Sequence, residues 1–192
     1  MYYKLFNDDT KYNFYNFNSI ETLNNKHNIY EINCSNSYLT QLPILPSNLQ
    51  FLYCYNNILT QLPLLPNSLI QLYCYNNQLT QLSELPLNLE YLDCRNNQLT
   101  QLPLLPDNLK FLNCSSNKLT QLPSLPKYLN RIYCNNNYKT LHKYIIHYKY
   151  LHIHKIYNKY KYSYTIHEIL NHTIKNYYYF AIIKYYDKYN NY

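Results

Sequence analysis

Six cysteines are the residues of this chain best suited to chemistry, and they are evenly spaced. Each follows the previous one by twenty residues, at Cys34, Cys54, Cys74, Cys94, Cys114 and Cys134. A zinc site usually takes its four ligands from closely spaced pairs, a spacing that this series lacks. No single cysteine is distinguished from the others by its surroundings, as a catalytic nucleophile would be. We therefore expect neither a zinc centre nor a catalytic cysteine.

A disulfide framework and a ladder of reduced, buried thiols are the two structural alternatives. Disulfide frameworks are typical of short secreted chains, whereas Met1 to Thr10 show no apolar core of a signal peptide. Neighbouring strands lie about 4.8 Å apart, but parallel side chains at equivalent positions fit disulfide geometry poorly. We favour reduced thiols that pack as small hydrophobic groups, and hence an intracellular compartment.

Other catalytic motifs are missing. The chain contains no glycine, which removes glycine-rich phosphate loops and nucleophile elbows. His142, His147, His152 and His154 could ligate a metal if their segment were a strand, but their spacing matches no established site. We expect no enzymatic activity, no metal and no cofactor.

The whole middle of the chain repeats with the period of the cysteines. Residues 49–68 show the unit, L-x-x-L-x-C-x-x-N-x-L-x-x-L-P-x-L-P-x-x. Copies begin at Ile29, Leu49, Leu69, Leu89, Leu109 and Leu129. A fixed period of about 20–50 residues indicates stacked units that bury their apolar faces against their neighbours.

This unit resembles the leucine-rich repeat, whose signature is L-x-x-L-x-(L/C)-x-x-N-x-L. Its twenty-residue length and L-P-x-L-P segment are similar to those of secreted effectors of pathogenic bacteria and of uncharacterised, Mimivirus-type giant-virus proteins. The resemblance covers residues 29–142 and implies a leucine-rich-repeat solenoid. Some bacterial relatives append a ubiquitin-ligase domain with a catalytic cysteine, which we do not expect here because no cysteine follows Cys134.

The residue pattern predicts the elements of each coil. Leu52 and Cys54 alternate with Tyr53 and Tyr55, as in a half-buried strand, so stacked repeats form a parallel sheet. Two prolines three residues apart favour an extended, polyproline-like return leg. We predict little or no helix within the repeats and one open sheet face. A column of asparagines should satisfy backbone groups where the coil bends: Asn57, Asn77, Asn97, Asn117 and Asn137.

Two flanks border the repeats, which gives three regions: a cap at 1–28, six repeats at 29–142 with the last one partial, and a flank at 143–192. Residues 18–23 are predicted to form a short helix that covers the first coil, and helical spacing also marks the second flank. Residues 139–192 carry nine lysines and two acidic residues, and 9 − 2 = +7 equals the net charge of the whole chain. No apolar run reaches the roughly 18 residues of a membrane span.

Two functions are compatible with these features. The first is a non-enzymatic scaffold, viral or effector-like, that binds host proteins through the open sheet face, where exposed aromatics and arginine are typical of binding hot spots. The candidate contacts are Phe51, Tyr53, Tyr55, Tyr73, Tyr75, Tyr91, Asp93, Arg95, Phe111, Arg131 and Tyr133. The structural alternative is that stacked tyrosines only stabilise the sheet. The second function is attachment to nucleic acid or an anionic surface through the basic, tyrosine-rich residues 139–192.

Overall fold

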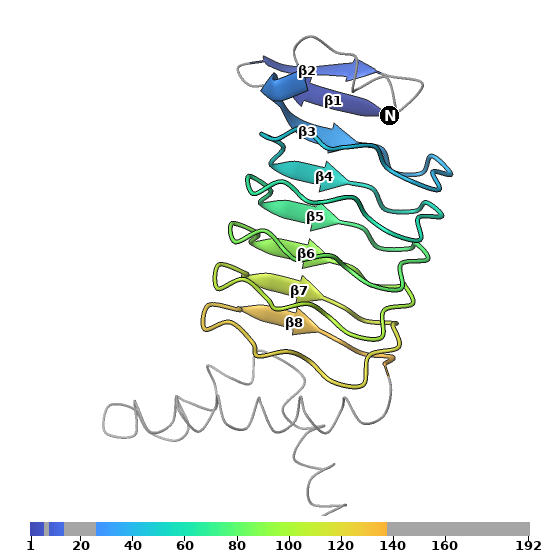
Figure 1. The fold of residues 1–192 in the computed structure, drawn as a ribbon, viewed down its shortest axis with the longest axis vertical. Coiled ribbons are helices and arrows are strands. Elements are labelled where there is room, and N and C mark those ends of the chain that lie inside the picture. The colour runs from blue at the N-terminus through green and yellow to red at the C-terminus, as the bar shows by residue number, and fades with distance from the viewer. Residues whose placement is uncertain (6–7, 14–25, 138–192) are drawn as a thin grey trace, which may run out of the picture. The chain divides into compact units, whose positions relative to one another are not determined.

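The computed structural model describes residues 1–5, 8–13 and 26–137, and these residues build one eight-stranded sheet in the order β2-β1-β3-β4-β5-β6-β7-β8 (Figure 1). Six strands run parallel, one from each repeat. They are β3 (Ile29–Asn33), β4 (Phe51–Tyr53), β5 (Gln71–Tyr73), β6 (Tyr91–Asp93), β7 (Phe111–Asn113) and β8 (Arg131–Tyr133). The predicted solenoid with a parallel sheet is confirmed.

Residues that pair across neighbouring parallel strands are one repeat period, twenty positions, apart in the sequence. Phe51 lies opposite Gln71, and Leu52 lies opposite Leu72, so equivalent residues of successive repeats form columns. The backbone ladder continues beyond the three strand residues, because the N–H of Cys54 donates to the carbonyl of Tyr73 at 2.9 Å. Equivalent side chains of neighbouring repeats, twenty residues apart in the sequence, therefore lie next to one another along the solenoid.

The return legs contain no helix in the described repeats, as the proline spacing predicted. After the second proline a turn leads back to the next strand, closed by a 3.0 Å hydrogen bond from the N–H of Leu69 to the carbonyl of Pro66. The short 3₁₀ segment η2 (Lys26–Asn28) precedes the first repeat. No helix in the described ranges has the length and apolar character needed to cross a bilayer.

Two antiparallel strands extend the sheet beyond the first repeat. β1 (Tyr2–Leu5) pairs with β3, and β2 (Asp8–Asn13) pairs with β1. The Nζ of Lys4 lies 3.0 Å from Glu31 Oε2, an ion pair that joins β1 to the first repeat. This β-structure was not foreseen from the sequence. The predicted helix at 18–23 and the flank at 143–192 lie outside the described residues.

Leucine and cysteine fill the space between sheet and return leg. Leu49, Leu52, Cys54 and Leu59 are fully buried, and the same positions are buried in the third, fourth and fifth repeats. Burying one such leucine side chain contributes about 1.5–3 kcal/mol relative to leaving it exposed. The core is thus a set of continuous apolar columns, each built from one position of the repeat.

Ser83 is the one residue that interrupts the first proline column. Its hydroxyl oxygen is buried, and no hydrogen-bond partner is found for it among the described residues. Its equivalents in the other repeats are Pro43, Pro63, Pro103 and Pro123. The backbone of the return leg therefore suits proline, and the serine leaves a polar group unsatisfied.

We expect Ser83→Pro to raise the free energy of unfolding by about 1 kcal/mol, because proline restricts the unfolded chain and removes the unpaired hydroxyl. Urea unfolding followed by circular dichroism measures the change. Ser83→Ala is the matched control, since it removes the hydroxyl without restricting the backbone, and it should gain less. A loss of stability in Ser83→Pro would contradict the equivalence of this position to the prolines.

Candidate functional site

The candidate site is the strand face, by which we mean the side chains that project from β4 to β8 on the side opposite the core. Three positions of each repeat contribute, starting with Phe51, Tyr53 and Tyr55 in the second repeat. The alternation predicted from the sequence is observed, since these three are half-buried whereas the intervening Leu52 and Cys54 are fully buried. The strand face therefore consists of three parallel columns.

Tyrosines stack on one another in two of these columns. The ring centroids of Tyr53 and Tyr73 lie 5.2 Å apart with the planes 18° from parallel. The rings of Tyr55 and Tyr75 are 4.5 Å apart and 5° from parallel. Strand spacing of about 4.8 Å sets this separation, which suits aromatic stacking. Each ring is consequently held in place by its neighbour.

Arg95 extends the second tyrosine column. Its Cζ lies 4.4 Å from the centroid of the Tyr75 ring, a cation–π contact. Its Nη1 lies 3.5 Å from Asp93 Oδ2, and its backbone N–H donates to Asp93 Oδ1 at 3.3 Å. The guanidinium is thus fixed between a ring and a carboxylate while its side chain stays 41% exposed.

Asp93 requires a correction, because it was predicted to project to solvent as a contact residue. It occupies the expected column but is only 5% exposed. Burial raises the pKa of Asp93, an effect opposed by the backbone N–H and the guanidinium of Arg95. Larger neighbours cover this short side chain, so within the solenoid it holds Arg95 in position.

The remaining predicted contacts form a less regular aromatic group. The rings of Tyr91 and Phe111 lie 6.2 Å apart, and those of Phe111 and Tyr133 lie 5.8 Å apart at a tilt of 50°. Phe51 meets Tyr30 edge-on at 6.1 Å. Arg131 is exposed. The structure therefore brings all eleven predicted residues onto one face, with Asp93 beneath the others.

Burial also affects the phenols of this face. It raises the pKa of Tyr53 to about 12, with Glu31 adding to the rise, and it raises the pKa of Tyr73 and Tyr75. These hydroxyls remain protonated at neutral pH and can donate hydrogen bonds.

The buried asparagine column turns the chain out of each strand. The Nδ2 of Asn97 donates to the carbonyls of Cys74, Cys94 and Arg95 at 3.1, 3.1 and 3.3 Å. Its Oδ1 accepts from the N–H of Leu79 at 3.0 Å. The same contacts recur at Asn57, Asn77 and Asn117. Each asparagine therefore joins its own coil to the preceding one.

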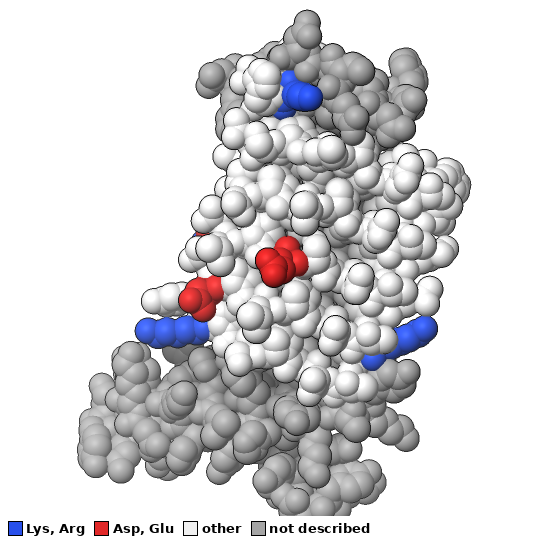
Figure 2. All heavy atoms as spheres, viewed as in Figure 1, with Lys and Arg blue, Asp and Glu red and all other residues white. Residues whose placement is uncertain are grey.

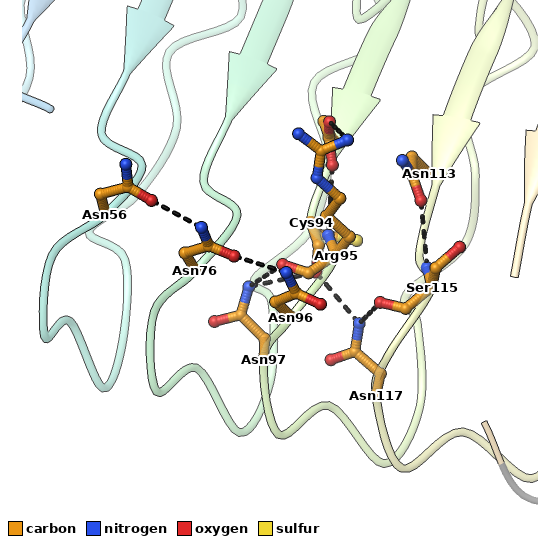
Figure 3. Close-up of polar contacts among 10 residues, drawn as sticks. Asn56, Asn76, Cys94, Arg95, Asn96, Asn97, Asn113, Ser115 and Asn117 are labelled. Carbon is orange, nitrogen blue, oxygen red and sulfur yellow. Dashed lines mark hydrogen bonds and ion pairs between the residues drawn. The ribbon is translucent and has the colours of Figure 1, made fainter. Parts of the chain in front are cut away.

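A second asparagine column, next to the first, was missed in the sequence. Its members have φ between 53° and 55°, in the left-handed region: Asn36, Asn56, Asn76, Asn96 and Asn136. Their amides bond from coil to coil, Asn76 to Asn56 and Asn96 to Asn76 both at 2.6 Å (Figure 3). Asparagine tolerates this backbone conformation better than most residues. The repeated Asn-Asn pair in a chain without glycine was the available signal.

All six cysteines are buried thiols. Burial raises the pKa of Cys34 from its ordinary value of 9.0 to about 12, and it raises the pKa of Cys54, Cys74, Cys94 and Cys114 well above that ordinary value. Such thiols are poor nucleophiles and poor metal ligands. The described part of the chain contains no group of three or more His, Cys, Asp or Glu side chains that could hold a metal ion.

Comparison with known proteins agrees with this geometry. A family model described as Leucine Rich repeats (2 copies) matches residues 87–127. The fold is a leucine-rich-repeat solenoid. No curated protein sequence matches the chain.

Three similar solved structures are bacterial effector proteins. YopM from Yersinia enterocolitica is 38% identical with a TM-score of 0.57, over 57% of this chain and 25% of that one. A Shigella effector LRR domain is 39% identical with a TM-score of 0.56, over 56% of this chain and 50% of that one. YopM from Yersinia pestis is 45% identical with a TM-score of 0.53, over 56% and 31%. The chain thus spans a quarter to a half of the length of these relatives.

We expect Asn97→Ala to lower the free energy of unfolding by roughly 3 kcal/mol, because it leaves the buried Leu79 N–H unpaired and removes one of the two amide donors from each of the Cys74 and Cys94 carbonyls. Chemical denaturation measures the loss. Asn96→Gly is the matched control at the adjacent position, since glycine retains the left-handed backbone and only an exposed amide contact disappears. If both variants lost the same stability, the buried column would not be what holds the coils together.

The buried thiols should make the solenoid unstable in alkali. Because their pKa is raised in the folded state, their contribution is complete below about pH 9 and is lost as the pH rises above it. Each thiol that ionises only on unfolding contributes a slope of about −1.4 kcal/mol per pH unit. Denaturant midpoints measured from pH 7 to 10.5 should therefore fall steeply above pH 9, and Cys94→Ala should show a shallower fall. A flat profile in this range would contradict thiol burial.

Proposed function

We propose that the repeats form a protein-binding scaffold whose partner contacts the strand face around Tyr75 and Arg95. The observation that carries the proposal is the stacked column of Tyr55, Tyr75 and Arg95, in which the rings and the guanidinium are held in order before any partner arrives. Tyrosine and arginine are enriched at binding hot spots. Side chains that are already ordered lose little conformational entropy on binding.

The low charge of the repeats supports a contact based on shape and short-range interactions. Residues 29–137 contain five basic and five acidic residues, and 5 − 5 = 0. Figure 2 shows one face on which charged groups are few and scattered. Long-range electrostatic steering, which requires a surface of one sign, is therefore weak here. A protein surface with exposed aromatic groups is a better match than a polyanion.

The fold and its relatives favour the same function. Leucine-rich-repeat solenoids typically serve as non-enzymatic interaction scaffolds, and the similar solved structures are described as effectors. By this resemblance the partner would be a host protein and the chain a viral or effector product. Attachment through the basic residues 139–192 remains a prediction, since these residues lie beyond the described part of the chain.

A double variant, Tyr75→Leu with Arg95→Lys, tests the strand face. Leucine retains apolar packing and lysine retains a cation beside Asp93, so the melting temperature should change by only a few degrees. Loss of the stacked ring and planar guanidinium should weaken partner binding by roughly 2 kcal/mol or more, which is about thirtyfold. Quantitative mass spectrometry of proteins captured by wild-type and variant chains measures the difference.

The return leg supplies the matched control. Leu64 and Leu104 are 88% and 83% exposed on the opposite side of the solenoid. Leu64→Asn with Leu104→Asn should leave both stability and the captured proteins unchanged. If this control loses partners that the strand-face variant keeps, the return leg is the binding surface.

A further inference from the structure

The columns of the strand face are interrupted at one place. In the second and third repeats, two positions of each strand carry tyrosines. At these two positions the fourth repeat carries Asp93 and Arg95, and the fifth carries Asn113 and Ser115. All of them except Arg95 are short polar residues. An aromatic ring returns at Tyr133 in the sixth repeat. Short polar side chains therefore stand between larger ones at these positions.

The spacing of the coils sets the distance at which a ring could stack beside Arg95. One face of the Arg95 guanidinium lies on Tyr75, and the next residue of its column is Ser115, which is too short to cover the other face. Successive coils are about 4.8 Å apart, close to the 4.5 Å that separates the stacked rings of Tyr55 and Tyr75. A ring at the level of Ser115 would therefore stack on Arg95. We call this place the ring slot, bordered by Arg95, Phe111, Asn113, Ser115 and Tyr133.

The floor of the ring slot has an unused hydrogen-bond donor. Asn113 is 7% exposed, and its Oδ1 accepts from the N–H of Ser115 at 3.2 Å. Its Nδ2 has no acceptor among the described residues. Figure 3 shows the oxygen joined to Ser115 while the amide nitrogen is directed away from it. Asp93 is the register partner of Asn113 on β6, so its carboxylate belongs to the same column as this amide.

The first repeat shows what such a pair of groups binds. There the hydroxyl of Tyr2 donates to Glu31 Oε1 at 3.1 Å and accepts from Asn33 Nδ2 at 3.4 Å. Asn33 also holds the N–H of Ser35 through its Oδ1, as Asn113 holds that of Ser115. A carboxylate and an asparagine amide thus satisfy a phenol at one end of the sheet. A carboxylate and an asparagine amide also meet at the ring slot, here on adjacent strands, and no phenol hydroxyl among the described residues bonds to either of them.

We propose that the ring slot receives a tyrosine side chain from the partner protein, inserted with its hydroxyl towards Asn113 and Asp93. The ring stacks on the open face of Arg95 and contacts Phe111 and Tyr133. The hydroxyl accepts from Asn113 Nδ2 and donates to the Asp93 carboxylate. This inference rests on the proposed function and specifies the chemistry of the partner, an exposed and unphosphorylated tyrosine.

Asn113 and Asp93 also determine which side chains the ring slot excludes. Phenylalanine fits the same space but offers no oxygen to the Asn113 amide, and an unpaired donor at a buried site discriminates strongly against it. Phosphotyrosine would place a phosphate against Asp93, where like charges repel. Phosphorylation of the partner tyrosine is therefore expected to release it.

Small phenols can test the ring slot on the full chain without knowledge of the partner. The probes are p-cresol, toluene, which lacks the hydroxyl, and p-tolyl phosphate. Their binding is followed by ¹⁵N NMR at the side-chain amide of Asn113 and the guanidinium of Arg95. We expect p-cresol to shift these signals saturably and to bind at least tenfold more tightly than toluene or p-tolyl phosphate.

Two variants test the hydrogen-bond donor of the ring slot and its free space separately. Asn113→Asp retains the acceptor for the Ser115 N–H but loses the Nδ2 donor, and it should weaken p-cresol binding at least tenfold. Ser115→Tyr fills the space from within the chain and should abolish binding while the fold is retained. Asn135→Asp, which adds the same charge outside the ring slot, should bind p-cresol as the wild type does. Equal binding of all three probes, or p-cresol binding unchanged in both slot variants, would overturn the proposal.

The result is distinguishable from a failure of the proposed function. If p-cresol does not bind at these signals but Tyr75→Leu with Arg95→Lys still loses the partner, the strand face binds proteins and the ring slot is wrong. If p-cresol binds as expected while the double variant retains every partner, the ring slot exists and the scaffold proposal is wrong.

Discussion

The solenoid depends on one buried amide in every coil. Because the side chain of Asn97 or its equivalent bonds to the backbone of two successive coils, it fixes both the bend after the strand and the distance to the previous repeat. Equivalent residues are then stacked at a constant spacing. The leucine core, the thiol column and the tyrosine stacks are all consequences of this spacing, since each position packs against its own copy.

Much of the fold could be predicted because the period appears directly in the sequence. Alternation at Leu52 to Tyr55 indicated which side chains face the core, and paired prolines indicated return legs without helix. The antiparallel strands β1 and β2 could not be predicted in this way, because they belong to no repeat. The left-handed asparagines were missed for another reason: the pattern reports which residues recur, whereas the backbone conformation at Asn56 follows from the bend between strand and return leg.

The columns of the candidate site followed from the sequence, whereas the exposure and contacts of their side chains required the structure. Column positions followed from the period alone, which is why the eleven predicted residues share one face. The exposure of each side chain could not be predicted from the period, because it depends on the size of the neighbouring side chains on adjacent coils. Asp93 is covered by larger side chains around it and acts through Arg95. Likewise, the open donor of Asn113 becomes apparent only when each of its hydrogen bonds has been assigned.

The strict register has a consequence for how such a chain can change in length. Contacts between coils join residues about twenty positions apart, so removing one whole unit, for example residues 69–88, would bring Leu49 against Leu89 and re-form every column. Duplication of a unit would do the same. Unequal recombination between repeats could therefore lengthen or shorten the solenoid by one repeat at a time, and each product would still fold. Selection would then act on which residues stand beside Arg95, and new surfaces could arise while the core stays the same.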